Sequence, residues 1–232
     1  MKNIFHYWYY IYYRPKIFFP KKTYSMFGED IFINTFFKNK KKGFYVDVGA
    51  YHPLDGNNTN LLYKKKNWNG INIDVNPFSI ELFNCTRKDD LNFNTAISNK
   101  KKAVKLYFRK KINMLNTLSK KMAKIHFRNG FQEKIVKTNT LNNIIERSKY
   151  KNQRIDFLNI DVEGNELNVL KSLNFKKYKP SLICIEIHNH EEMYNQSSDY
   201  LRRNPIHKYV LKKKYKVIWR HEFSYIYKSI KK

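Results

Sequence analysis

The stretch Ile155-Asp-Phe-Leu-Asn-Ile-Asp-Val-Glu-Gly-Asn-Glu166 decides the fold class of this 232-residue chain. Its apolar residues predict a buried strand over 155–160, and a helix is expected over about 165–173. Two acidic residues, Asp161 and Glu163, come directly after the strand. A buried strand, a polar turn and a helix in succession are typical of α/β proteins.

Similar units lie on both sides of this stretch. Strands are expected at 44–48, 70–75, 92–97 and 182–187, and helices at 58–66, 77–86, 141–147 and 206–213. Asn57 or Asn58 is the expected cap of the helix at 58–66. The alternation predicts an α/β fold with a mostly parallel sheet, which binds its ligand beyond the carboxyl ends of its strands.

Two regions depart from this alternation. Segments 103–108 and 133–138 are expected to be extra strands around a lysine-rich insert. Near the end of the sequence, strands at 215–220 and 224–228 have too few residues between them for a crossover helix, so they must form an antiparallel hairpin. The length predicts one domain over 24–232, with an aromatic and basic extension over 1–23.

The formal net charge is +27, from 46 Lys and Arg against 19 Asp and Glu. Such a charge is typical of nucleic-acid-binding proteins. The lysines, however, lie in many short runs, and they accompany abundant Asn, Ile, Tyr and Phe, which share A- and T-rich codons. We therefore expect compositional drift, and keep a nucleic-acid methyltransferase or RNA-binding protein as the alternative. Two cysteines are too few for a disulfide framework or a zinc site.

The extension over 1–23 is rich in Tyr, Trp and Phe and is interrupted by Arg14-Pro15-Lys16. It lacks the cleavage site of a signal peptide, and no stretch of the sequence has the length and apolarity of a membrane span. We expect it to dock on its own domain or on a partner chain, with peripheral membrane contact through residues 5–19 as the alternative. The expected location is the cytoplasm, with the inner face of the membrane as a second site.

The few acidic residues are more informative than the many lysines. Asp47, Asp74 and Asp161 each end an apolar run, and Gly49 would let a ligand approach the backbone after the first of them. Asp74 stands where an acid holds ribose hydroxyls in nucleotide sites. Because the pyrophosphate motif G-x-G-x-x-G is absent, the pattern favours a nucleoside without a pyrophosphate, such as S-adenosylmethionine. Asp47 or Asp161 would then hold its cationic sulfonium.

Further motifs accompany the stretch quoted first. They are Tyr24-Ser-Met-Phe-Gly-Glu-Asp30, Gly43-Phe-Tyr-Val-Asp-Val-Gly-Ala-Tyr-His-Pro53, Asn57-Asn-Thr59, Trp68-Asn-Gly-Ile-Asn-Ile-Asp-Val-Asn-Pro77 and Cys184-Ile-Glu-Ile-His188. Together they resemble the FkbM family of S-adenosylmethionine-dependent methyltransferases, which usually act on sugar hydroxyls. Met26 stands where that family usually has Gln. The resemblance implies a class I methyltransferase (Rossmann-like) fold, with a seven-stranded sheet and a reversed last strand.

The resemblance also implies roles for individual residues. Around the cofactor it places Asp47, Gly49 and Ala50 at the methionine, Asp74 at the ribose, Asn76 and Ala96 at the adenosine, and Asp161 at the sulfonium. The residues that would close the pocket over the acceptor are Glu29, Asp30, His52 and Asn58. The implied acceptor is a sugar of a polysaccharide or glycolipid.

The expected reaction is in-line transfer of the methyl group to a sugar hydroxyl. A neutral hydroxyl is a poor nucleophile, so a base within hydrogen-bond reach is needed. Glu163 and His188 are equal candidates for this base, and Asp161 is a third that is better placed on the cofactor. No metal is expected, although a divalent ion is the alternative because several metal-type ligands lie close in sequence, namely His188, His190, Glu191 and Glu192.

Overall fold

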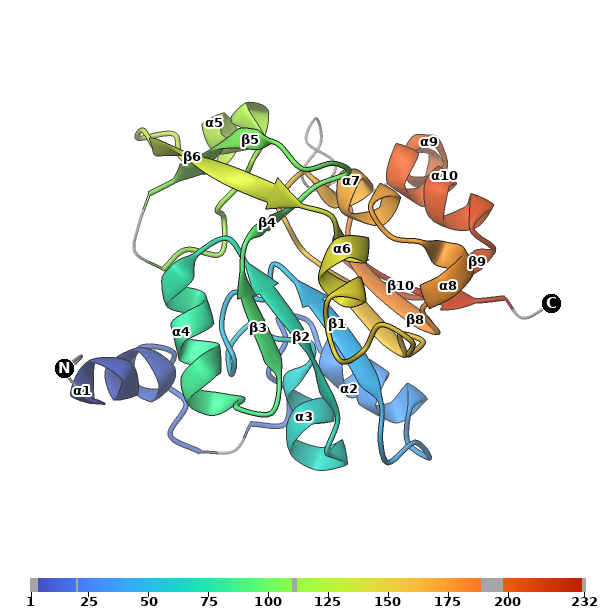
Figure 1. Ribbon diagram of the computed structural model, residues 1–232, viewed down its shortest axis with the longest axis horizontal. Coiled ribbons are helices and arrows are strands. Elements are labelled where there is room, and N and C mark those ends of the chain that lie inside the picture. Colours follow the sequence, from blue (N-terminus) through green and yellow to red (C-terminus); the bar gives the residue numbers. More distant parts are fainter. Residues whose placement is uncertain (1–3, 20, 110–111, 189–197, 231–232) are drawn as a thin grey trace.

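The computed structural model describes residues 4–19, 21–109, 112–188 and 198–230. Within them, one seven-stranded sheet has the strand order β3-β2-β1-β7-β8-β10-β9 (Figure 1). Its strands are β1 (Phe44–Val48), β2 (Asn69–Asp74), β3 (Leu91–Asn94), β7 (Phe157–Ile160), β8 (Leu182–Glu186), β9 (Tyr215–His221) and β10 (Ser224–Ser229). The first five in this order run parallel, and β10 is antiparallel to both β8 and β9. The expected α/β fold, with a reversed last strand, is confirmed.

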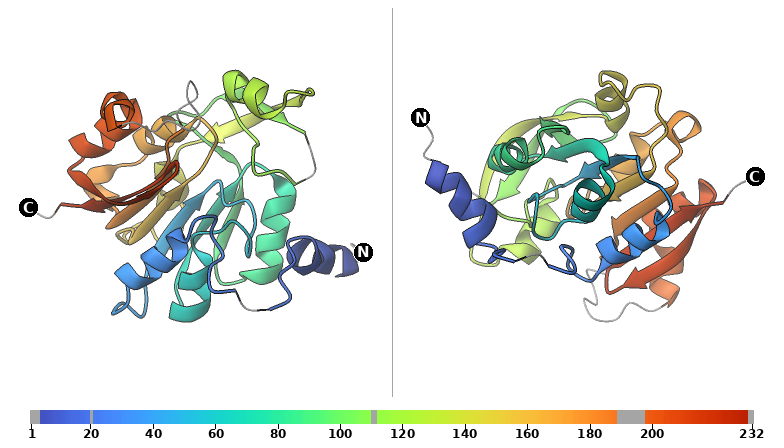
Figure 2. Two further views of the ribbon diagram at one scale, coloured as in Figure 1. Left: turned by 180° about the vertical axis from the view of Figure 1, so that it is seen from behind. Right: turned by 90° about the horizontal axis from the view of Figure 1, so that it is seen from below.

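Helices cover both faces of this sheet (Figure 2). The elements on one face are α6 (Leu141–Glu146), α7 (Glu166–Lys171), α8 (Phe175–Tyr178), α9 (Ser198–Arg203) and α10 (Pro205–Lys212), which pack on the apolar side chains of β1, β7 and β8. On the other face lie α2 (Glu29–Phe36) and α3 (Asn60–Lys66), whose Ile33 and Leu62 contact Tyr45 and Phe157. The central strands β1 and β7 are buried along their whole length, which explains their near-continuous apolar sequence.

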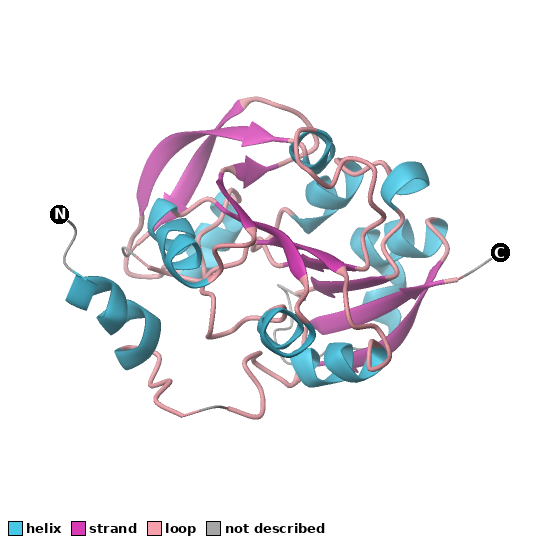
Figure 3. Ribbon diagram, turned by 60° about the horizontal axis from the view of Figure 1, so that its bottom comes forward, coloured by secondary structure: helices cyan, strands magenta, loops and turns pink. Residues whose placement is uncertain are grey.

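A second, three-stranded sheet stands apart from the first (Figure 3). It has the order β4-β6-β5, from β4 (Ala96–Ile97), β6 (Gln132–Asn139) and β5 (Ala103–Phe108). The extra strands expected at 103–108 and 133–138 are therefore confirmed. The single strand expected at 92–97 is wrong, because the chain leaves the main sheet at Thr95 and Ile97 pairs with Asn139 of β6.

The helix α5 (Lys120–His126) lies between β5 and β6 and was not expected from the sequence. Ser119 caps it, since its Oγ accepts a hydrogen bond of 3.3 Å from the N–H of Met122. The cap expected for α3 also needs correction. Thr59 is the N-cap, and Asn57 instead accepts the N–H of Thr59 through its side-chain oxygen at 3.0 Å.

The aromatic segment, which we define as residues 4–19, begins with α1 (Ile4–Trp8) and a π-helical turn at Tyr9–Tyr13. It lies beside α4 (Pro77–Thr86), where Tyr7 donates a hydrogen bond of 3.1 Å to Glu81. Ile11 and Ile17 are buried in the same contact. No helix in the described ranges is long and apolar enough to cross a membrane.

Candidate active site

A cavity lies at the carboxyl ends of β1, β2 and β7, where a parallel sheet of this kind binds its ligand. Four of the residues implied for the cofactor line it, namely Gly49, Asp74, Ala96 and Asp161. Leu106, Asn113 and Met114, from β5 and the insert that follows it, close the opposite side. The small sheet and its insert thus complete a pocket that the main sheet begins.

Gly49 lets two loops meet at the floor of this cavity. Its φ angle is +81°, and a Cβ added there would lie 1.6 Å from the carbonyl oxygen of Asp161. Only glycine combines this backbone conformation with so close an approach. The loops after β1 and β7 are therefore in direct backbone contact, which brings Asp161 to the edge of the cavity.

Asp74 ends β2 and is held in place by backbone donors. Its carboxylate accepts hydrogen bonds from the N–H of Tyr51 at 2.8 Å and from that of Asn76 at 2.7 Å. Burial raises the pKa of Asp74 to about 6, in spite of these two donors. The carboxylate thus has a fixed direction in the cavity and is charged at neutral pH.

Asp47, which the resemblance implies at the methionine, is not among the residues that line the cavity. Its carboxylate accepts hydrogen bonds from the side chains of Asn159 at 2.8 Å, Thr59 at 3.1 Å and Asn57 at 3.3 Å. Arg87 donates to Thr59 and Asn57 from the other side. Burial raises the pKa of Asp47, and these donors oppose the rise. Asp47 therefore anchors the loop after β1.

Ala50 and Asn76 also lie outside the cavity lining. The N–H of Ala50 donates to the carbonyl of Ile73 at 3.1 Å, which fixes the same loop to β2. Asn76 is the N-cap of α4, and its side-chain oxygen accepts the N–H of Phe78 at 3.0 Å. Both residues therefore hold the backbone at the edge of the cavity, and their implied contact with the cofactor stays a prediction.

The four residues implied for the acceptor separate into two pairs. Asp30 is fully buried and accepts hydrogen bonds from Thr23, the N–H of Tyr24 and Ser25. His52 accepts the N–H of Leu54 on Nδ1, so its Nε2–H donates to the carbonyl of Tyr10 at 3.0 Å. Burial lowers the pKa of His52 to about 4. Both residues therefore hold the N-terminal part of the chain, and their implied role at the pocket stays a prediction.

The other two acceptor residues lie near the strand ends. Asn58 donates a hydrogen bond of 2.9 Å to Asn159 of β7, and its Nδ2 lies 3.7 Å from Cys184 Sγ of β8. Glu29 begins α2 and accepts the N–H of Phe27 at 2.8 Å. The charge of Glu29 also contributes to raising the pKa of Glu186, which places it within electrostatic range of β8. Glu29 and Asn58 therefore stay candidates for acceptor contacts.

Four side chains beside the cavity form what we call the Glu-His cluster: Glu163, Glu186, His188 and His126. The ligand-type atoms of the first three lie within 4.8 Å of one another. His188 Nε2 lies 2.9 Å from Glu186 Oε2 and 4.0 Å from Glu163 Oε2. His126 Nε2 lies 2.9 Å from the same Glu163 oxygen. Both expected bases, Glu163 and His188, thus lie in one group, whereas His190, Glu191 and Glu192 fall outside the described residues.

The backbone at Glu163 has an uncommon conformation for a residue with a side chain. Its φ angle is +54°, in the left-handed region that favours glycine. Thr117 in the insert fixes it, since its hydroxyl donates to the carbonyl of Glu163 at 2.6 Å. Strained residues of this kind gather at functional sites, and here the conformation directs the Glu163 side chain towards the cluster.

Unbalanced negative charge surrounds the cluster. Burial, together with the charges of Glu186, Glu163 and Glu166, raises the pKa of Asp161 well above its usual value. Burial also raises the pKa of Glu186, and that of Glu166 to about 7. Burial disfavours protonated His188, but its hydrogen bond to Glu186 and the neighbouring carboxylates outweigh this and raise its pKa. The site is thus prepared for a cation.

His126 is the residue of this site that sequence reasoning missed. It is the last residue of α5, in the insert for which the sequence predicted no helix. Ser119 before a run of helix-forming residues is a signal that could have marked α5. Contact between His126 and Glu163, 37 positions further along the chain, depends on how the insert folds back over β7.

Comparisons with known proteins give the chain its family. A search of curated proteins finds no match. Residues 47–211, well over half of the chain, match the family described as the Methyltransferase FkbM domain. This range contains the cavity, the loops after β1, β2 and β7, and the Glu-His cluster. The chain therefore belongs to the FkbM methyltransferase family.

Proposed function

We propose that this methyltransferase uses S-adenosylmethionine and transfers its methyl group to a sugar hydroxyl of a glycan or glycolipid. The observation that carries the proposal is the cavity at the strand ends, lined by Gly49, Asp74 and Asp161 and bordered by the Glu-His cluster. It joins a nucleoside-type pocket to a group of proton acceptors. The cofactor and the acceptor thus each have a chemically suitable place.

In the proposed complex, Asp74 accepts the ribose hydroxyls, because its carboxylate already has a fixed direction in the cavity. Ala96, Ile97 and Leu106 offer an apolar surface for the adenine. The methionine part runs past Gly49, where the missing side chain leaves the backbone accessible. Asp161 faces the sulfonium, because a carboxylate with surplus negative charge around it favours a cationic ligand.

The acceptor reacts by displacement at the methyl carbon. The hydroxyl oxygen forms a bond to this carbon while the bond from carbon to sulfur breaks, and its electron pair stays on sulfur. The hydroxyl proton passes to the Glu-His cluster, where Glu163 is the acceptor. The products are the methyl ether and S-adenosylhomocysteine. Residues that position the reactants and accept this proton supply most of what the protein contributes.

The polarity of the acceptor side supports a neutral sugar over a nucleic acid. Glu29, Glu163 and Glu186 lie near this side, and Asn58 adds an amide that can donate and accept hydrogen bonds. Sugar hydroxyls donate to such carboxylates, whereas phosphate groups are repelled by them. The lysines that give the chain its net charge lie mainly on exposed surfaces. A nucleic acid would bind these surfaces without entering the acidic site.

The decisive test has two parts. First, S-adenosylmethionine is titrated calorimetrically into the wild-type protein, into Asp74→Ala and into the control Asp55→Ala, whose side chain pairs with Lys21 at 3.8 Å outside the cavity. We expect binding to be lost only in Asp74→Ala. Second, mass spectrometry compares the surface polysaccharide of cells with and without the protein. A methyl ether that depends on the protein supports the proposal, and methylation of RNA or DNA instead would overturn the sugar assignment.

A further inference from the structure

The Glu-His cluster contains buried polar atoms with no hydrogen-bond partner. Among the described residues, neither Glu163 Oε2 nor His126 Nε2 has one, although these two atoms lie 2.9 Å apart. Glu163 is only 6% exposed, so water does not satisfy its oxygen. Leaving buried polar atoms unpaired is costly. The arrangement therefore points to a ligand that takes electron pairs from both atoms.

A metal cation is the ligand that fits such a pair. When two donor atoms bind one ion at right angles, each at about 2.1 Å from it, the two atoms lie about 3 Å apart. No hydrogen bond between them is then needed, and the distance of 2.9 Å between Glu163 Oε2 and His126 Nε2 agrees with this arrangement. The distances from His188 Nε2 to Glu186 Oε2 and Glu163 Oε2, 2.9 Å and 4.0 Å, also agree with ligands of one ion. Glu163 comes from the loop after β7, and Glu186 and His188 come from β8 and the residues after it, so their three ligand-type atoms converge from two strand ends.

We propose that Glu163, Glu186 and His188 bind a divalent cation, and that His126, which lies beside Glu163 Oε2, moves in as a fourth ligand. A mixed set of carboxylates and imidazoles favours Mn²⁺, Fe²⁺ or Zn²⁺ over Mg²⁺ or Ca²⁺, which prefer oxygen ligands alone. The proposal rests on the methyltransferase site described above and deepens it. The ion binds the acceptor oxygen and lowers the pKa of its hydroxyl. Glu163 then binds the ion through Oε2, and its other carboxylate oxygen accepts the hydroxyl proton.

The test measures metal binding without any cofactor or acceptor. The purified protein is treated with EDTA, dialysed and titrated with MnCl₂, and the electron paramagnetic resonance signal of free Mn²⁺ is followed. ZnCl₂ is titrated in parallel by calorimetry. Glu186→Gln and His188→Gln test the ligands, and His221→Gln is the matched control, because this histidine is exposed and contacts the rings of Phe27 and Trp219.

We expect one ion per chain, and affinity lowered about tenfold or more in both ligand variants but unchanged in the control. Absence of saturable binding at millimolar metal, or equal loss in His221→Gln, would overturn the proposal. Titration of S-adenosylmethionine in the presence of EDTA separates this outcome from failure of the proposed function. If the cofactor binds there and the metal does not, only the metal proposal is lost.

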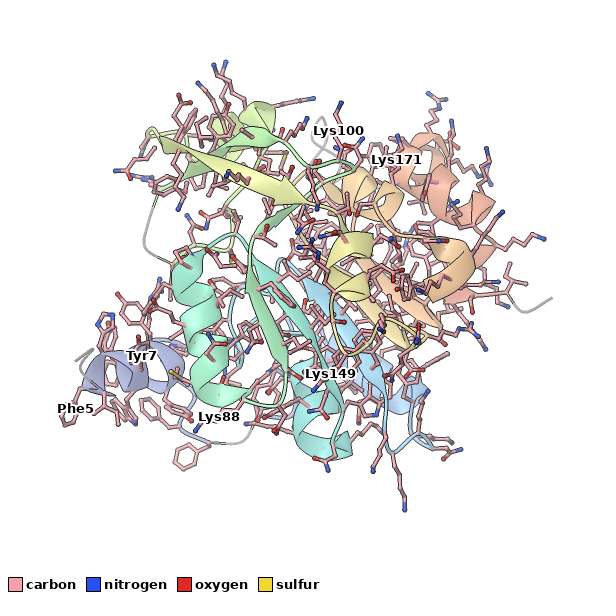
Figure 4. All side chains as sticks on the ribbon, in the orientation of Figure 1. Phe5, Tyr7, Lys88, Lys100, Lys149 and Lys171 are labelled. Atoms are coloured by element: carbon pink, nitrogen blue, oxygen red, sulfur yellow. The ribbon has the colours of Figure 1, made fainter. Side chains whose placement is uncertain are left out.

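The aromatic segment supports a second inference, which is independent of the Glu-His cluster. Its inner side is buried, but its outer side exposes several large apolar side chains, of which Phe19 is 82%, Ile4 77% and Phe5 74% exposed. Figure 4 shows Phe5 at the outer edge of the molecule, whereas Tyr7 lies towards the body. Trp8, Tyr13 and Phe18 are also exposed. So large an apolar surface on one segment marks a site of interaction.

The charge of the N-terminal residues indicates an anionic partner for the aromatic segment. Residues 1–28 contain no Asp or Glu, and their basic residues are Lys2, Arg14, Lys16, Lys21 and Lys22. Lys88 lies at the same edge of the molecule in Figure 4. Aromatic side chains combined with basic ones suit the interface of an anionic lipid bilayer, where rings insert among the headgroups and cations approach the phosphates. We infer that the aromatic segment docks the protein on such a membrane surface.

Vesicle sedimentation tests this inference. The full-length protein is mixed with vesicles of phosphatidylcholine alone or with added phosphatidylglycerol. The double variant Phe18→Ser/Phe19→Ser is compared with Ile135→Ser, which removes an equally exposed apolar side chain on β6 and leaves the charge unchanged. We expect binding to anionic vesicles to fall about tenfold or more in the double variant only. Equal binding by all three proteins, or no binding by the wild type, would overturn it.

Discussion

Two groups of buried acids in this protein have opposite surroundings. Asp30 and Asp47 accept hydrogen bonds from several neighbouring donors, and both tie loops to the body. Asp161 Oδ1 and Glu163 Oε2 have no hydrogen-bond partner in the part of the chain that the structure describes, although both oxygens are shielded from solvent. The difference shows that burial alone does not mark a functional acid. The acids prepared for a ligand are those with an oxygen that accepts no hydrogen bond from the described residues.

The largest expected effect is on the reaction rate. Glu163→Gln removes a charge from the Glu-His cluster while keeping its shape, so kcat should fall by about 10²–10⁴-fold at saturating cofactor. Methyl transfer to the acceptor polysaccharide measures it. Glu146→Gln is the matched control, since its carboxylate pairs with Lys177 at 2.9 Å on the surface. An equal fall in both variants would mean that Glu163 has no special role.

Replacing Asp47 and Asp161 by alanine should distinguish an acid that stabilises the fold from one that is kept for a ligand. Asp47→Ala leaves the side chains of Asn57, Thr59 and Asn159 without their acceptor and removes the negative charge near Arg87, so the free energy of unfolding should fall by about 3 kcal/mol. Asp161→Ala should keep or raise that free energy at neutral pH, because burial and neighbouring carboxylates make its charge costly in the folded state. Urea unfolding compares the two. A larger loss in Asp161→Ala would reverse the comparison.

The pH dependence of cofactor binding tests the role of Asp74. The pKa of Asp74 is raised to about 6, so its carboxylate is charged above this pH and gains a proton as the pH falls through it. If the charged form binds the ribose, the dissociation constant should rise about tenfold between neutrality and about pH 5. Calorimetric titrations across this range measure it. Asp74→Asn should remove the step, and a step that persists in this variant belongs to another group.

The smallest effect concerns the residue that holds the aromatic segment. His52→Ala removes the hydrogen bond to the carbonyl of Tyr10, which should loosen residues 4–13 by about 1 kcal/mol. Faster amide hydrogen exchange in this segment, with unchanged cofactor binding, is the expected result. His207→Ala, which removes a buried hydrogen bond to Tyr227 elsewhere, is the control. Loss of cofactor binding in His52→Ala would indicate that His52 contributes to the cofactor pocket.

The sequence predicts the main sheet because its strands are apolar runs with acids at their ends. The pattern of Asp74 and Asp161 likewise indicates residues that line the cavity. It cannot separate Asp47 from Asp161, because the partners of Asp47 are Thr59 and Asn159, which meet it only in the folded chain. It also misses His126, whose contact with Glu163 depends on the insert. Local pattern shows which residues reach the strand ends, and tertiary contacts decide which of them stay unpaired.

In the proposed complex, Asp161 holds the positive sulfonium of the cofactor. S-adenosylmethionine and S-adenosylhomocysteine differ in this charge and the methyl group, so their two dissociation constants, measured for wild type and Asp161→Asn at about pH 8, test it directly. We expect Asp161→Asn to weaken the binding of S-adenosylmethionine about tenfold more than that of S-adenosylhomocysteine. Equal weakening of both ligands, or of neither, would contradict it.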